Sequence, residues 1–170
     1  MISYYQYLQF SPYFAQQDIE KTDDRIKFLK SFDNLPQPIK DLLTSLDTTE
    51  KIINTGKTFG LDNYDTEAVS FVVRKIAAGD TFVGEGASLI STETELPLEK
   101  AKNLLSLVVR EILSPALEDV KKIQTIKFPQ RFGTPASVNA QTPQTPTRPP
   151  IKQPESIQSD NPNVINLRNR

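Results

Sequence analysis

The chain has 170 residues, of which 37% are apolar and 24% are charged, and its formal net charge is −1 at pH 7. This length suits one domain with extensions. Cysteine and histidine are both missing, which excludes disulfides, thiolate chemistry and imidazole catalysis within the chain. No window approaches the roughly 20 apolar residues of a spanning helix, and the N-terminus lacks a secretory pattern. We therefore expect a cytoplasmic protein with no membrane span.

The charge is divided unevenly along the chain. Residues 1–126 hold 14 Lys and Arg against 19 Asp and Glu, whereas residues 127–170 hold six against two. An acidic body weighs against a nucleic-acid-binding domain, because phosphate contacts need a basic face. The positive charge of the tail is dilute, so nucleic acid is an unlikely partner by this criterion.

Residues 1–21 are predicted to form a flexible arm rich in aromatic residues. Its aromatic side chains are Tyr4, Tyr5, Tyr7, Phe10, Tyr13 and Phe14. Aromatic anchors carry much of the binding energy at protein interfaces. The sequence leaves open whether this arm docks on the protein's own surface or on a partner.

Residues 22–127 show apolar spacing typical of helices, which predicts an all-α domain, a compact bundle of about five to six helices. The first helix is expected to bury Ile26, Phe28, Leu29 and Phe32. Pro36 or Pro38 would then start a second helix, since proline is tolerated in a first turn. Its expected buried side consists of Leu42, Leu43 and Leu46.

A third helix is predicted over residues 48–59. Asp47 and Glu50 have the spacing of a capping box, and Gly60 is a plausible left-handed stop. The fourth helix, in "YDTEAVSFVVRKIAAG", has a broad apolar stripe from Tyr64 onward and is expected to end at Gly79.

A short or irregular fifth helix should follow, because Gly84 and Gly86 each cost about 1 kcal/mol in a helix interior. The longest pattern, "LPLEKAKNLLSLVVREILSPALEDVKKIQ", suits a helix that starts at Pro97, turns Leu98 inward, and kinks or restarts at Pro115. No segment alternates with period two, so no sheet is expected.

Motifs that suggest chemistry have simpler structural interpretations. "TGKT" at residues 55–58 has Lys51 where a phosphate loop needs glycine, so it is interpreted as a helix end. "GEGASL" lacks the third glycine of a dinucleotide fingerprint and suits a close helix contact. "DNYDTE" lacks the spacing of a calcium loop and is typical of a helix cap.

Paired carboxylates such as Glu95 with Glu99, or Glu111 with Glu118, are typical of solvated helix faces. We therefore expect no catalytic residues, no metal ligands and no cofactor, and a protein that is not an enzyme.

The end of the chain changes character. Residues 128–161, with seven of the thirteen prolines, are predicted to be a disordered linker that spans roughly 30 to 36 Å. Residues 162–170, "PNVINLRNR", form a predicted short linear motif. Its expected partner-binding residues are Val164, Ile165, Leu167, Arg168 and Arg170.

Three stretches carry a resemblance: "LPQPIKDLLTSLDTTEKI", "GLDNYDTEAVSFVVRKIAAGD" and "LPLEKAKNLLSLVVREILSPALEDV". Together, at about residues 35–122, they resemble a family of small all-helical proteins from bacteria with reduced genomes. In that family similar helices follow in the same order, with a Leu-Pro start, a glycine-ended fourth helix and a proline-marked last helix. The family carries no assigned activity, so the resemblance implies a fold and no site residues.

The terminal "VINLRNR" also resembles the C-terminal recognition peptide of the bacterial tubulin homologue of cell division. In that peptide a flexible linker ends in an apolar stretch, a Leu-Arg pair and basic residues. Leu167, Arg168 and Arg170 match, whereas the Pro and Phe usual before the Leu-Arg pair are absent here. The resemblance implies a shared logic of tethered recognition.

Two functional hypotheses follow. The first is a protein-protein interaction module or adaptor, in which a helical domain holds an unidentified protein partner or forms a homo-oligomer and a linker carries the terminal peptide to a second partner. The alternative is a nucleic-acid-associated protein that reads duplex DNA with its third and fourth helices and contacts phosphates with its basic tail.

Overall fold

The computed structural model describes residues 2–15 and 22–132. The chain divides into two units, residues 1–135 and residues 136–170, and every described residue belongs to the first. The terminal peptide and the linker beyond residue 132 therefore lie outside the described residues.

Every regular element in the described residues is helical, which confirms the all-α prediction. The α-helices are α1 (Tyr4–Phe10), α2 (Thr22–Phe32), α3 (Gln37–Thr44), α4 (Leu46–Phe59), α5 (Asn63–Ala77), α6 (Gly86–Thr94), α7 (Leu98–Leu107) and α8 (Leu117–Lys127). The shorter turns are η1 (Val83–Glu85), η2 (Val108–Ile112), η3 (Ser114–Ala116) and η4 (Pro129–Arg131). The eight α-helices exceed the predicted five to six, because the expected arm contains α1 and the last predicted helix is divided.

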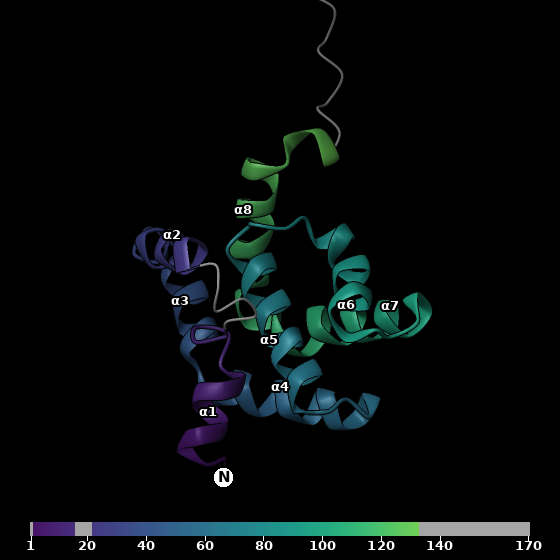
Figure 1. Ribbon diagram of the computed structural model, residues 1–170. Coiled ribbons are helices and arrows are strands. Elements are labelled where there is room, and N and C mark those ends of the chain that lie inside the picture. Colours follow the sequence, from purple (N-terminus) through teal and green to yellow (C-terminus); the bar gives the residue numbers. More distant parts are fainter. Residues whose placement is uncertain (1, 16–21, 133–170) are drawn as a thin grey trace, which may run out of the picture. The chain divides into compact units, whose positions relative to one another are not determined.

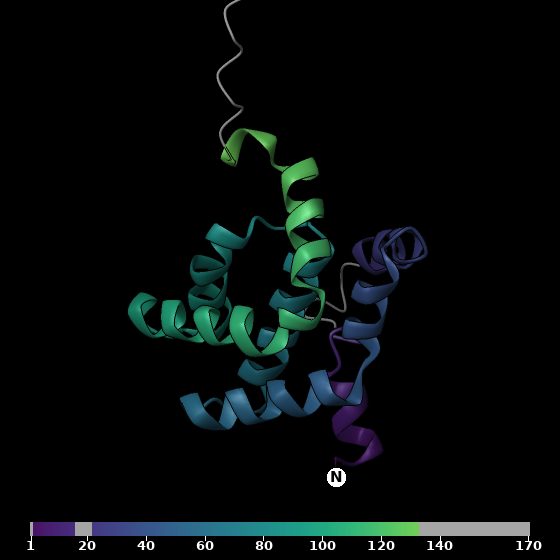
Figure 2. The same ribbon diagram turned by 180° about the vertical axis from the view of Figure 1, so that it is seen from behind.

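Helix α5 lies at the centre of this helical unit. Figure 1 shows it between α2 and α3 on one side and α6 and α7 on the other, and the reverse view shows α8 crossing it (Figures 1 and 2). Nine of its fifteen residues are buried, among them Val69, Val72 and Ile76. Helices α1, α3, α4, α6 and α8 therefore use α5 as a common packing surface.

Residues 2–15 contain the helix α1 and pack partly against the rest of the helical unit, which differs from the flexible arm predicted for residues 1–21. The Ser3 and Gln6 side chains form a capping box at the start of α1. The Tyr7 hydroxyl donates to the Thr44 carbonyl at 2.7 Å, and Phe10 and Ala15 are buried. The described part of the predicted arm thus docks on the protein's own surface.

The predicted boundaries of the third and fourth helices are nearly right, but the first cap differs. Ser45 is the N-cap of α4, and its hydroxyl accepts from the Thr48 amide, so Asp47 and Glu50 do not form the expected capping box. Asp47 instead pairs with Lys51 at 2.7 Å. Because the extended Ser45 separates α3 from α4, Leu46 starts a helix and is 59% exposed rather than buried.

Several residues predicted to face the core are exposed instead. Only Phe28 of the expected face of α2 is fully buried, whereas Ile26 and Leu29 are 43% and 40% exposed. Tyr64 and Leu98 also lie at the surface, each in the first turn of its helix. Apolar spacing alone does not reveal how much of a helix its neighbours cover, and α2 is covered along one narrow seam.

The predicted restart at Pro115 is confirmed. The Leu113 amide bonds to the Val108 carbonyl at 2.9 Å, which widens the end of α7 into the π turn η2. Proline lacks an amide hydrogen and its ring opposes a continued helix, so η3 breaks the axis before α8 begins. The helical unit then extends past the predicted boundary at residue 127, because Phe128 and Phe132 contact the Phe82 ring.

Gly60 and Gly79 offer a matched test of the packing of α8. Both have left-handed backbones, with φ of 70° and 71°, as the sequence predicted for helix stops. A Cβ at Gly60 would meet no atom within 4 Å, whereas one at Gly79 would overlap Cγ2 of Ile123 and lie 2.9 Å from Cδ of Lys127.

We expect Gly60→Ala to lower the free energy of unfolding by about 1 kcal/mol, which is the cost of the left-handed backbone. Gly79→Ala should cost about 2 to 4 kcal/mol, because it adds overpacking against α8 to the same strain. Urea unfolding followed by circular dichroism measures both. Equal losses in the two variants would contradict the close packing of α8 on the turn that follows α5.

Candidate functional site

The structure shows the role of each sequence motif that suggested chemistry. The "TGKT" segment is the last turn of α4, where Thr58 donates to the Asn54 carbonyl, and Gly60 ends the helix. The Asp62 carboxylate caps α5 by accepting from the Asp65 amide at 2.8 Å. A Cβ at Gly86 would lie 2.9 Å from side-chain atoms of Ile76 and Leu105, so the glycine allows close helix contact. All three structural interpretations are confirmed.

The predicted partner-binding residues Val164, Ile165, Leu167, Arg168 and Arg170 lie outside the described residues. Within the described ranges, no group of three or more acidic side chains is arranged to hold a metal ion. The candidate site described below comes from the helical unit and was not predicted from the sequence.

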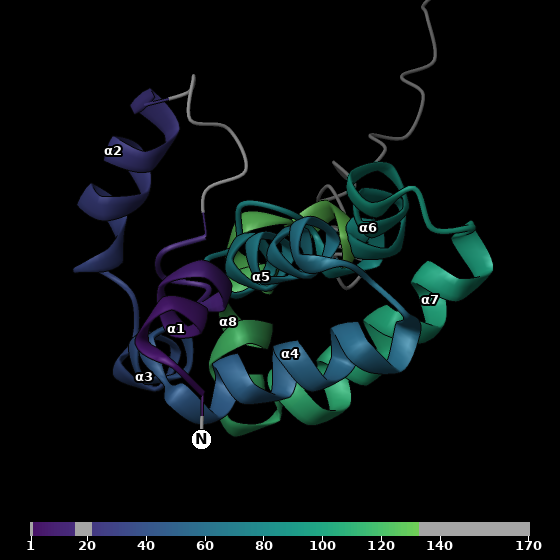
Figure 3. The same cartoon turned by 60° about the horizontal axis from the view of Figure 1, so that its bottom comes forward.

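A cleft of about 310 Å³ lies between α2 and α5. Figure 3 shows α2 standing away from α5 (Figure 3). The α2 wall carries Asp24, Lys27, Phe28 and Ser31; the opposite wall carries Phe71, Arg74, Lys75 and Asp80. Aromatic rings and charged groups of both signs therefore share one concave surface.

The α2 wall follows from helical spacing. Residues 24, 27, 28 and 31 follow one another at steps of three, one and three, so that they lie on one face of the helix. Two acidic residues in the first turn and Lys30 in the last turn stabilise the helix dipole. Phe28 anchors this face through edge contacts with Tyr13, and its ring also lies against that of Phe32.

Arg74 lies at the base of the cleft and is only 7% exposed. Its guanidinium carbon is 4.9 Å from the centre of the Phe28 ring and 5.0 Å from that of the Phe71 ring, so it is held between two aromatic faces. Its Nη1 donates to the Ala15 carbonyl. Among the described residues this is its single hydrogen bond, although a guanidinium carries five N–H donors.

A second arginine lies near the same ring. The Arg25 guanidinium is 5.3 Å from the centre of the Phe28 ring and 5.1 Å from that of Tyr13, and it donates to the Tyr13 carbonyl. The two arginines thus hold the backbone of residues 13–15 against α2 and α5. Burial, and to a smaller extent the nearby positive charge of Arg25, lower the pKa of Arg74 to about 10, against a weaker opposing effect of Asp80 and Asp24. Burial also lowers the pKa of Arg25.

The charges at the rim are only partly balanced. Asp24 pairs with Lys27 at 3.3 Å, and Asp80 pairs with Lys127 at 3.4 Å. The Lys75 ammonium instead lies 4.7 Å from the centre of the Phe71 ring. In the part of the chain that the structure describes, neither Arg74 nor Lys75 has an ion pair. The cleft therefore has a positive, incompletely paired base.

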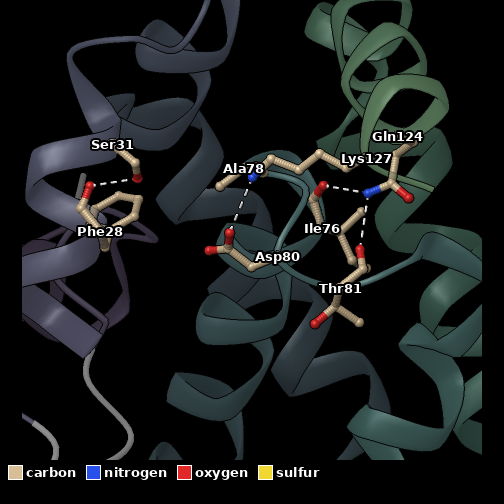
Figure 4. A network of polar contacts seen from close by, with 8 residues as sticks. All are labelled: Phe28, Ser31, Ile76, Ala78, Asp80, Thr81, Gln124 and Lys127. Atoms are coloured by element: carbon tan, nitrogen blue, oxygen red, sulfur yellow. Dashed lines mark hydrogen bonds and ion pairs between the residues drawn. The ribbon is translucent and has the colours of Figure 1, made fainter. Parts of the chain in front are cut away.

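A polar clamp from α8 holds the turn that carries Asp80 (Figure 4). The Gln124 side chain is 1% exposed; its amide nitrogen donates to the Ile76 and Thr81 carbonyls, both at 2.9 Å. Its oxygen accepts from the Val83 amide at 3.0 Å, and the Lys127 ammonium donates to the Ala78 carbonyl at 2.9 Å. These bonds fix the turn that carries Asp80 against α8.

Sequence reasoning missed both Arg74 and Gln124. Each is a polar residue inside a helix whose predicted apolar stripe runs beside it. Helical periodicity normally assigns such residues to the solvent face. The only signal for Arg74 was its place directly beside Val73 and two positions before Ile76, at the edge of the apolar stripe.

Neither a family model, nor a curated protein, nor a solved structure matches the chain. The resemblance of residues 35–122 to small bacterial helical proteins therefore stays a prediction. In the described ranges no helix is both long enough and apolar enough to cross a membrane.

Replacing Gln124 by methionine keeps the side-chain volume but removes all its hydrogen bonds. The Val83 amide and the Thr81 carbonyl would lose their partner, while the Ile76 carbonyl keeps the Gly79 amide. We expect Gln124→Met to lower the free energy of unfolding by about 2 to 4 kcal/mol. The exposed Gln130 is the matched control, and Gln130→Met should change the free energy of unfolding by less than about 0.5 kcal/mol. Urea titrations compare the variants, and similar midpoints would refute the clamp.

The lowered pKa of Arg74 predicts a pH dependence of stability. Because the pKa of Arg74 is about 10 in the folded state and higher in the unfolded chain, the unfolded chain binds more protons as the pH rises through 10, and stability rises with pH there. Relative to Arg74→Met, the original chain should gain about 1 kcal/mol in free energy of unfolding between pH 9 and pH 11. Lysines and tyrosines cancel in this difference. A difference that stays constant over the range would contradict the burial of a charged guanidinium.

Proposed function

We propose that this protein is an adaptor that joins two protein partners. The helical unit binds one partner through the cleft between α2 and α5, and the terminal peptide at residues 162–170 binds the other. The segment between them acts as a tether. No catalytic step is assigned to the chain.

The observation that carries this proposal is the division of the chain into two units. The first unit has a hydrophobic core of its own. Its buried members are apolar side chains drawn from several helices, the first of them Phe28 and the last Val120. Val164, Ile165 and Leu167 belong to the second unit, and in the sequence they form a short apolar cluster after a long polar, proline-rich stretch. An apolar cluster in such a setting favours a binding role.

The terminal peptide suits one of two recurring modes of peptide recognition. Val164, Ile165 and Leu167 can enter an apolar groove or add as a short strand to a sheet edge. Arg168 and Arg170 then meet acidic groups at the rim of that surface. A tether raises the effective concentration of the second site toward the millimolar range where its span suits the geometry.

The position of α5 weighs against the DNA-binding alternative. A reading helix must expose one face to enter a major groove. Helix α5 is buried over nine of its residues, and Asp62 and Asp65 lie at its N-terminal end, where they would repel phosphates. This argument favours a protein partner for the helical unit.

Deleting the last nine residues should abolish capture of one set of partners and keep the other, because the two binding elements act separately. A point variant, Leu167→Asp, should reproduce the deletion, whereas Asn169→Ala is the matched control outside the apolar and basic residues. Quantitative affinity capture from the native cell measures both sets, and thermal unfolding should be unchanged in all three variants.

Identical partner sets for the full chain, the deletion and Leu167→Asp would refute the adaptor. Steep salt-dependent binding of the full chain to duplex DNA at low salt would also refute it, in favour of the nucleic-acid alternative.

A further inference from the structure

We propose that the cleft between α2 and α5 binds an acidic segment of a partner protein, with one carboxylate side chain placed at the Arg74 guanidinium between the rings of Phe28 and Phe71. This inference rests on the proposed function, because it names the chemistry of the partner that the helical unit holds.

The first argument is the hydrogen bonding of Arg74. A buried guanidinium needs acceptors for its N–H groups, since buried polar groups without partners cost free energy. The structure supplies the Ala15 carbonyl, which leaves most N–H groups of this side chain without an acceptor among the described residues. Because Arg74 lines the cleft, a ligand in the cleft reaches these donors. A carboxylate matches the planar fork of a guanidinium with two parallel hydrogen bonds.

The second argument is the charge around that base. Arg74 and Arg25 lie close to the same Phe28 ring, so their positive charges repel each other. Lys75 adds a third positive charge beside Phe71. Asp24 and Asp80 on the walls attract Arg74 weakly, but neither forms an ion pair with it, and each pairs instead with a lysine, Lys27 or Lys127. A single bound negative charge would relieve this repulsion, whereas a cation would add to it.

The third argument is the size and form of the cleft. Its volume of about 310 Å³ lies at the lower end for ligand pockets and accommodates an acidic side chain with part of its neighbours. The aromatic walls keep water from the guanidinium and strengthen its attraction for a carboxylate. The rim carries exposed charges of both signs on Asp24 and Lys27, which suits the polar backbone of a bound chain. A segment of protein fits this open rim better than a free small acid.

The experiment uses the full chain and a fluorescein-labelled eight-residue peptide with Glu-Glu at its centre and a Leu on each side. The matched probe has Gln-Gln in place of Glu-Glu. Fluorescence anisotropy should show at least tenfold tighter binding of the Glu peptide. Amide shifts in NMR spectra should cluster at Ser31, Phe71 and Arg74.

Variants then test the base of the cleft. Arg74→Met should weaken binding of the Glu peptide at least tenfold, and Lys75→Met should weaken that binding a few fold. Lys102→Met is the control, because Lys102 is an exposed lysine on α7 that pairs with Glu99 at 2.7 Å. Circular dichroism checks that each variant is folded, and Lys75→Met keeps the test decisive if Arg74→Met unfolds.

Equal binding of the Glu and Gln peptides would overturn the proposal, as would unchanged binding in folded Lys75→Met. If inorganic phosphate or free glutarate produces the same amide shifts with a lower Kd than the peptide, a small anion is the ligand and the protein partner is refuted. The chain without residues 162–170 should bind the Glu peptide as tightly as the full chain. The experiments on the terminal peptide can therefore refute the adaptor function without refuting this binding site, and the peptide-binding experiment can refute the site without refuting the role of the terminal peptide.

Discussion

Burial of α5 on most of its surface is the constraint on which the rest of the structure depends. A central helix must find partners for every polar group it takes out of water, and α5 contains Ser70 and Arg74 on its buried side. Ser70 donates to the Phe10 carbonyl at 2.7 Å, and Arg74 donates to the Ala15 carbonyl. The N-terminal residues therefore belong to the helical unit for a polar reason as well as an apolar one. At the other end of α5, Gln124 and Lys127 bond the carbonyls that the helix leaves open.

This constraint explains which features the sequence could predict. Helix starts and stops depend on neighbours a few residues apart, so proline in the first turn of α3, the Asp62 cap and the two left-handed glycines were all readable. The Ser3 and Gln6 capping box was equally local, but the cluster of aromatic residues around it led to the prediction of a flexible arm. What no local pattern contains is the partner across the fold. The Tyr7 bond to Thr44 joins residues 37 positions apart, and the Ser70 bond to Phe10 joins residues 60 apart.

The cleft was hidden for the same reason. Phe28 and Phe71 looked like two apolar positions on separate helices, and Arg74 looked like a charge at the edge of a stripe. Only the fold brings the three together and removes water from the guanidinium. Exposure of Ile26 and Leu29 has a related origin, because α2 is attached by the aromatic seam of Phe28, Phe32 and Tyr13 and not by a broad apolar face. A helix attached in this way leaves space beside it.

The energetics of Arg74 separate a structural role from a binding role. Fixing the Ala15 carbonyl needs one donor, which a neutral side chain could supply without the cost of burying a charge. The guanidinium brings a full positive charge and several further N–H groups into a place where a second arginine already repels it. Burial and the second arginine disfavour this charge in the helical unit alone, and under the proposed role an anion in the cleft would offset that cost. A site built this way is expected to bind its ligand with an affinity set by charge, because the folded chain has already met the cost of desolvating the cation.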